Sequence, residues 1–207
     1  MFYFVKTPWW LKQLYKECIW EIPAREKVLY LTFDDGPHPE ATPFVLDLLK
    51  KYNAKATFFC LGKNVHEYPA IYRRIVDEDH KTGNHTYNHM NGWKSDDKKY
   101  FEDVVLARKY IDSNLFRPPY GKASKLQIKH LRSDFDLKVV MWSVLSGDFD
   151  QKLSQETCLK NVLLSCKEGS IVVFHDSAKA FGKLTYVLPR MLEFFSERGY
   201  RFDKINL

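Results

Sequence analysis

Two adjacent carboxylates, Asp34 and Asp35, end a short apolar run, LYLTF at residues 29–33. Gly36 and Pro37 follow and stop the strand that this run predicts. Both carboxylates should therefore lie at the carboxyl-terminal edge of a sheet, where α/β folds carry their chemistry. Like charges this close need a nearby cation. An ordinary Asp-Gly turn is the competing interpretation when these residues are taken alone.

Two histidines in the segment GNHTYNH have a spacing typical of a metal site. His85 and His89 are four positions apart, so a single helical turn would point both imidazoles in the same direction. With the Asp35 carboxylate they would form a three-ligand set that leaves one position open for water, as in catalytic zinc sites. A pair of core or surface histidines is the alternative that this spacing leaves open.

Three more polar residues stand at turns or at the end of an apolar run. Arg117 precedes a Pro-Pro turn, Asp148 follows a glycine, and His175 ends the run IVVF. Taken singly, each has an ordinary explanation as a surface arginine, a turn residue or a hydrogen-bonded histidine at a strand end. Their occurrence in one ordered set with the carboxylates and the histidine pair favours a shared site.

The segments that must position these residues alternate between short apolar runs and amphipathic stretches. Strands are predicted at residues 29–33, 56–61, 139–144 and 171–175. Helices are predicted after the cap residues Thr42, Ser95, Ser124 and Ser154, and from Pro69. Repeated βα units imply a parallel sheet flanked by helices. About six or seven such units, without a Rossmann glycine fingerprint, predict an α/β fold closed like a barrel.

The N-terminal residues are rich in aromatic side chains. Thr7 and Pro8 predict the N-cap and first residue of a short helix with Trp10 on its apolar face. This helix could pack over the end of the domain, or lie on a membrane surface with its tryptophans among the lipid headgroups. We expect residues 1–26 to be a helical extension packed on a main domain formed by residues 27–207.

Composition and charge exclude several classes of protein. The 207 residues are 45% hydrophobic, and the net charge of +6 comes from scattered basic residues, so we expect no nucleic-acid partner. The four cysteines lack C-x-x-C spacing and are expected as buried free thiols, with a disulfide left open. The sequence contains neither an 18-residue apolar stretch nor the pattern of a secretory signal. It therefore predicts no transmembrane segment and a cytoplasmic location, with peripheral membrane contact or export of a trimmed chain as alternatives.

Five segments together resemble the five motifs of the polysaccharide deacetylases, the carbohydrate esterase family 4 proteins with a NodB homology domain. They are TFDDGP at 32–37, HTYNH at 85–89, RPPYG at 117–121, WSVLSGDF at 142–149 and VFHD at 173–176. The resemblance covers roughly residues 27–203. It implies a distorted (β/α) barrel of about seven parallel strands, and hydrolysis of the N-acetyl group of an N-acetylglucosamine-containing glycan.

The resemblance also implies a role for each matching residue. One divalent ion, zinc or alternatively Co²⁺, Ni²⁺, Mn²⁺ or Fe²⁺, would be held by Asp35, His85 and His89. Proton transfer and oxyanion stabilisation would involve the base Asp34 with its partner Arg117, the acid His175 with its orienting Asp148, and the backbone N–H of Tyr120. Contacts with the substrate would come from Pro118, Trp142 and Leu145.

The physical chemistry of these groups suits the implied roles. A divalent ion lowers the pKa of its bound water from 15.7 toward about 7 and polarises an amide carbonyl. The positive charge of Arg117 favours the ionised form of Asp34, and Asp148 would raise the pKa of His175 and fix its ring. Departures from the family pattern, Leu145 for an aspartate and Phe149 for a tryptophan, predict a different pocket wall.

Two alternative functions stay open. The same amide hydrolysis could act on another amide, such as a formamido or acetamido sugar precursor. A non-catalytic sugar-binding relative would keep the fold and the metal, but it would be expected to lose Asp34 or His175 first, and both are present.

Overall fold

The structure is a computed structural model that describes residues 3–207. In chain order its elements are α1 (Trp9–Leu14), β1 (Val28–Asp34), α2 (Ala41–Lys51), β2 (Ala56–Cys60), α3 (Gly62–Glu67), α4 (Pro69–Asp77), β3 (Lys81–Asn84), α5 (Asp97–Arg108), β4 (Leu115–Phe116), the 3-10 turn η1 (Pro119–Gly121), α6 (Lys125–Ser133), β5 (Lys138–Val139), β6 (Val144–Leu145), α7 (Gln155–Ser165), β7 (Ile171–His175), α8 (Ala178–Ser196) and β8 (Arg201–Phe202).

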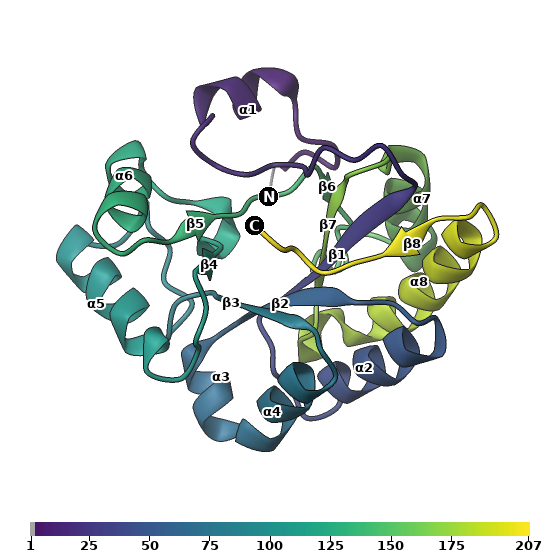
Figure 1. Cartoon of the computed structure of the whole chain (residues 1–207), viewed down its shortest axis with the longest axis horizontal. Helices are drawn as coiled ribbons and strands as arrows, with labels where there is room; N and C mark the ends of the chain where they lie inside the picture. The colour runs from purple at the N-terminus through teal and green to yellow at the C-terminus, as the bar shows by residue number, and fades with distance from the viewer. Residues whose placement is uncertain (1–2) are drawn as a thin grey trace.

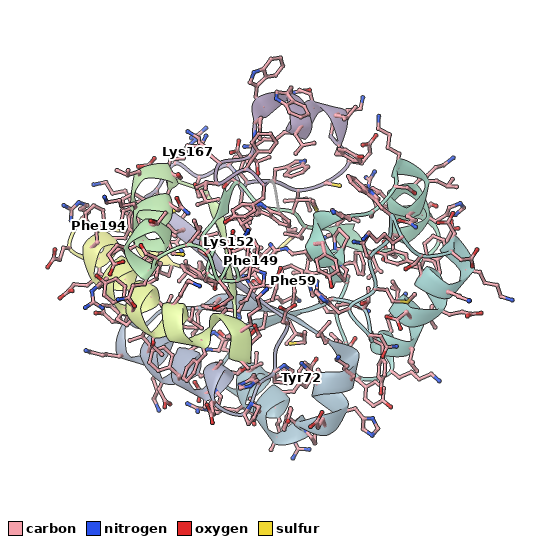
Figure 2. The ribbon with its side chains drawn as sticks, turned by 180° about the vertical axis from the view of Figure 1, so that it is seen from behind. Phe59, Tyr72, Phe149, Lys152, Lys167 and Phe194 are labelled. Carbon is pink, nitrogen blue, oxygen red and sulfur yellow. The ribbon has the colours of Figure 1, made fainter. Side chains whose placement is uncertain are left out.

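A curled sheet of parallel strands lies at the centre, and the helices surround it (Figure 1). The strand order is β5-β4-β3-β2-β1-β7-β6, and β8 pairs with the start of β1. This arrangement confirms the predicted distorted barrel of about seven parallel strands. In Figure 2, Phe59 and Phe149 lie near the middle of the ring of helices, whereas Phe194 lies on the outer helix α8.

The central strand β1 is buried along nearly its whole length, and β2 and β7 flank it on its two sides. The Phe33 ring stacks between those of Phe58 and Phe174, with centroids 5.1 and 5.9 Å away. Parallel pairing places Asp34 opposite His175 on β7, so the strand ends that the sequence singled out meet at one edge of the sheet.

The barrel has an open seam between β5 and β6, which are neighbours in the chain but lie at opposite ends of the strand order. Among the described residues no pairing joins these two strands. The predicted continuous strand at 139–144 is wrong, because β5 ends at Val139 and β6 begins only at Val144. Residues 3–22, here called the N-terminal cap, bridge the seam. Ile19 pairs with Val140 on one side, and Lys6 pairs with Val144 on the other. Helix α1 lies over this gap, at the top of Figure 1.

Several predicted helix starts differ in detail. Thr7 is not an N-cap, because Pro8 occupies that position and the Thr7 hydroxyl donates to the Trp142 carbonyl oxygen at 2.7 Å. Thr42 lies inside α2, where its hydroxyl donates to Asp176, and α5 is capped by Asp96 rather than by Ser95. The predicted caps at Ser124 and Ser154 and the helix start at Pro69 are confirmed.

Two predictions about covalent state and membrane spans can also be compared with the structure. All four cysteines are free, and three of them are buried, which confirms buried thiols and rules against the disulfide that was left open. Across residues 3–207, no helix combines the length and apolarity needed to pass through a bilayer.

Candidate active site

The predicted metal ligands converge at the carboxyl-terminal edge of the sheet. Asp35 directly follows β1 and has a φ of 82°. His85 directly follows β3, which is separated from β1 by β2. Asp35 Oδ1 lies 3.2 Å from His89 Nε2 and 3.7 Å from His85 Nε2. One ligand atom from each residue fits within 4.8 Å of the others, which is close enough for a shared ion.

The helical turn predicted for His85 to His89 is wrong, because this segment is an irregular loop. Thr86 and His89 have φ values of 64° and 61°, which a helix does not allow. The Thr86 N–H donates to Asn84 Oδ1 at 2.8 Å, and the Met90 N–H donates to the Thr86 hydroxyl. The loop therefore brings both imidazoles to one carboxylate through side-chain hydrogen bonds that replace the helical ones.

Asp103 on α5 holds this loop and was missed by the sequence reasoning. Its carboxylate accepts hydrogen bonds from the N–H groups of Tyr87 and Asn88 at 2.9 and 2.8 Å, and from Asn88 Nδ2 at 2.6 Å. Asn84 Nδ2 also donates to the carbonyl oxygen of Val104, so adjacent residues of α5 hold both parts of the loop. A carboxylate among the apolar, buried positions of α5 was the available signal.

The protonation of the two imidazoles suits metal binding. Burial, and then the neighbouring His89, lower the pKa of His85 to about 3, so its ring is neutral. His85 Nδ1 lies 2.7 Å from the Arg117 carbonyl oxygen, which fixes the proton there and leaves a lone pair on Nε2. Burial also lowers the pKa of His89.

The surroundings of the Asp35 carboxylate also suit a metal ligand. Its Oδ1 atom is buried and, within the described chain, has no hydrogen-bond partner. The two nearby imidazole nitrogens are therefore lone-pair neighbours rather than the cations of an ion pair. Three electron-pair donors that face one point without a proton between them fit a divalent cation, and the set leaves a coordination position open.

Asp34 lies beside this cluster in a buried ion pair. Arg117 Nη1 donates to Asp34 Oδ1 at 2.7 Å, and both side chains are almost completely buried. The guanidinium also donates to Thr32 Oγ1 and to the carbonyl oxygens of Val140 and Met141. These four bonds use most of its N–H donors and hold the charge in place, as burial of an ion pair requires.

His175 faces the cluster from β7 and is paired with Asp148. His175 Nδ1 and the His175 N–H each lie 2.8 Å from one oxygen of the Asp148 carboxylate, which is fully buried. Burial lowers the pKa of His175, but the charge and hydrogen bond of Asp148 outweigh it, with Asp35 and Asp34 contributing, and raise the pKa to about 9. The Phe149 ring packs edge-on against His175 at 5.1 Å. The imidazole is thus a proton donor at neutral pH.

Asp176 is a second residue to which sequence reasoning gave no role. Its carboxyl group accepts from the Gly36 N–H at 3.0 Å and from the Thr42 hydroxyl, beneath the turn that carries Asp35. Burial raises its pKa to about 8. A Cβ atom on Gly36 would lie 2.1 Å from Asp176 Oδ2, which explains why the turn needs glycine.

The predicted substrate contacts lie together next to the cluster. Pro118, Trp142 and Leu145 all line a cavity of about 340 Å³, and Tyr120 lies at its edge with its ring 4.5 Å from the ring of His89. Tyr120 is the second residue of η1, a position whose N–H has no acceptor inside a helical turn. Its N–H is thus suited to bind an external oxygen.

Comparison with known proteins gives consistent results. The family model described as polysaccharide deacetylase matches residues 21–139. A peptidoglycan-N-acetylglucosamine deacetylase of Bacillus cereus is 35% identical and covers 90% of each chain. A chitooligosaccharide deacetylase of Azorhizobium caulinodans is 31% identical over 82% of this chain and 90% of its own. The crystal structure of the Bc1960 peptidoglycan N-acetylglucosamine deacetylase has a TM-score of 0.86, with 32% identity over 96% of this chain and 95% of its own.

Proposed function

The chain belongs to the polysaccharide deacetylase family, and on this premise we propose that it hydrolyses the N-acetyl groups of N-acetylglucosamine units in a glycan. One observation carries the proposal: the Asp35, His85 and His89 cluster, the Asp34–Arg117 pair and the His175–Asp148 pair meet at one edge of the sheet. The named relatives support peptidoglycan and chitooligosaccharides as the substrate class.

Asp35, His85 and His89 would hold one divalent ion, and their two nitrogens and one oxygen favour zinc over Co²⁺, Ni²⁺, Mn²⁺ or Fe²⁺. Such an ion, when bound, makes water a nucleophile at neutral pH and polarises the amide carbonyl. Asp34 accepts the proton of the attacking water, and its ion pair with Arg117 fixes its orientation. Water attack therefore begins on the β1 side of the site.

His175, on the neighbouring strand β7, completes the reaction. Departure of the amine requires a proton, and the raised pKa of His175 keeps one available on its ring. Asp148 holds Nδ1, so Nε2 carries the proton toward the substrate. The Tyr120 N–H donates to the oxygen on which negative charge develops.

The division of the chain into a catalytic domain and an N-terminal extension is part of the proposal. Residues 27–207 would form the catalytic domain, and residues 1–26 would be an extension packed on it, because the N-terminal cap bonds to the strands on both sides of the seam. Peripheral membrane contact by α1 is the finer alternative, supported by Trp9, which is 76% exposed.

The test is acetate release from chitooligosaccharides and peptidoglycan fragments, combined with metal analysis of the same protein. The wild type should release acetate. Asp34→Asn should abolish turnover and retain the metal, while His85→Ala should lose both. Asp77→Asn, which changes an exposed carboxylate on α4, is the matched control and should stay active. An Asp34→Asn variant with full activity would refute the role of the base, and release of another acid from a formamido sugar alone would favour the second amide class.

A further inference from the structure

We propose that the N-terminal cap forms one wall of an acyl-binding pocket, so that the chain also hydrolyses amides whose acyl group is longer than acetyl. This inference rests on the proposed function. The pocket is the cavity of about 340 Å³ at the open seam of the barrel.

The seam explains why a cavity exists at this place. Because β5 and β6 do not pair, the sheet leaves a gap beside Trp142, and the cap covers that gap instead of a strand. The cap is fastened at both ends: Thr7 N–H donates to the Ser143 carbonyl oxygen, and Met141 N–H donates to the Ile19 carbonyl oxygen at 2.7 Å. Between these attachments Leu11, Leu14, Tyr15 and Cys18 line the cavity.

The lining of the cavity is mainly apolar. Leu11, Tyr15 and Trp20 from the cap share it with Ala123, Met141 and Trp142 from the barrel. Two polar groups of the lining are already used, since the Thr7 hydroxyl donates to the Trp142 carbonyl oxygen and Trp20 Nε1 donates to the Tyr15 carbonyl oxygen. This mainly apolar lining offers a sugar ring few hydrogen-bond partners in place of water, whereas a hydrocarbon chain needs none.

The proposed reaction geometry directs the acyl group toward this cavity. The Tyr120 N–H binds the carbonyl oxygen, so the carbon that carries the acyl substituent lies next to Tyr120. The Tyr120 ring lines the cavity on one side and contacts the His89 ring on the other. The amine departs toward His175, and the acyl substituent extends from the reacting carbon past the Tyr120 ring toward Trp142 and Leu145, which line the same cavity.

The size of the cavity exceeds what an acetyl group needs. A methyl group takes up about the volume of one water molecule, roughly 30 Å³ in the liquid. The cavity, at about 340 Å³, therefore has room for several further methylene groups. Each methylene that is buried there should improve kcat/KM by up to about fourfold.

The first experiment compares chitotetraose carrying N-acetyl, N-butyryl or N-hexanoyl groups, with release of the free amine as the readout. We expect kcat/KM for the butyryl and hexanoyl substrates to equal or exceed that for acetyl. A decrease of more than tenfold from acetyl to butyryl would overturn the inference and leave the proposed deacetylation intact. Failure to hydrolyse any of the three would count against the proposed function instead.

Two leucine variants locate the effect. Leu11→Trp should fill the cavity and lower the hexanoyl-to-acetyl ratio of kcat/KM by at least tenfold. Leu164→Trp, at a position on α7 that is 84% exposed, adds the same side chain elsewhere and should leave the ratio unchanged. An unchanged ratio in Leu11→Trp, in a variant that unfolds at the wild-type temperature, would contradict the placement of the acyl chain.

A binding measurement tests, without turnover, whether the cavity takes an apolar ligand. The apolar probe N-phenyl-1-naphthylamine should bind the metal-free wild-type protein with enhanced fluorescence, and Leu11→Trp should weaken its binding at least tenfold. Leu164→Trp should bind the probe as the wild type does. Equal probe binding by wild type and Leu11→Trp would show that the cavity does not take an apolar occupant.

Discussion

Replacing Asp148 by asparagine tests whether His175 works as the proton donor. The fully buried Asp148 carboxylate is the main reason why the pKa of His175 is about 9 instead of 6.5. Without that charge, burial dominates, so the pKa should fall to 6.5 or below, a change of at least about 3 kcal/mol at 1.36 kcal/mol per unit. The folded enzyme would then lose the reactive proton as the pH rises through 6.5 rather than through 9.

The consequence for activity depends on pH. At pH 8 the protonated fraction of His175 should fall from about 0.9 to about 0.03, which lowers kcat/KM roughly thirtyfold. At pH 5.5 both forms are largely protonated, so this part of the loss should shrink to within about twofold. The assay is the pH profile of kcat/KM for acetate release, in which the alkaline limb of Asp148→Asn should move to lower pH.

The matched control is Asp150→Asn, which removes the same charge two residues along the same loop. Asp150 accepts from the Tyr3 hydroxyl and not from His175, so this variant should keep the alkaline limb of the wild type. A loss in Asp148→Asn that is equally large at pH 5.5 and pH 8 would refute the reasoning, because asparagine would then act only by misorienting the ring.

Two further predictions concern the buried polar residues around the cluster. Asp103→Asn should weaken binding of Zn²⁺ about 10–100-fold in a chelator competition assay, since an amide cannot accept from all three donors of the Tyr87–Asn88 loop. The control is Glu102→Gln, at the exposed position next to Asp103, which should bind Zn²⁺ as the wild type does. Equal Zn²⁺ affinities for Asp103→Asn and wild type would contradict the role of Asp103 in holding the loop. Arg117→Met should lower the free energy of unfolding in urea by about 3–5 kcal/mol, because Asp34 would be left buried without its cation. Adding Asp34→Asn to Arg117→Met should recover part of the lost free energy of unfolding. The control Arg73→Met, on the surface of α4, should change it little. An Arg117→Met protein as stable as the wild type, with an unchanged pH profile, would exclude the buried pair as a stabilising element.

The sequence predicted those parts of the site that depend on strand ends. Asp34 and His175 could be brought together because parallel strands place their carboxyl ends at one edge, whatever the loops do. The spacing of His85 and His89 indicated a shared ligand set, but the helical turn proposed for it was wrong. The conformation of that loop depends on Asn84 and Asp103, and a local pattern does not reveal hydrogen bonds from another element.

The apolar pattern of the sequence could not predict the seam, for a related reason. VVMWSV is buried almost throughout and so resembles a strand, yet its bonds change partner along its length. The Val140 N–H donates to Phe116 on β4, the Met141 N–H to Ile19 of the N-terminal cap, and the Ser143 N–H to Ile171 on β7. Apolar periodicity reports burial, whereas pairing depends on which partner lies alongside. Here the partners include residues of the N-terminal cap, and the Thr7–Trp142 hydrogen bond joins positions 135 apart in the chain.

This seam also limits how the molecule can be divided. A fragment cut to residues 21–139, the limits of the family match, would keep Asp34, Asp35 and both cluster histidines but would omit His175 and β7, the neighbour of β1. A chain that stops before residue 139 would also leave the N-terminal cap without Val140, Val144 and Ser170, with which its backbone forms bridges. We expect closure of the seam to come late in folding, because its contacts join residues far apart in the chain, such as Thr7 and Trp142.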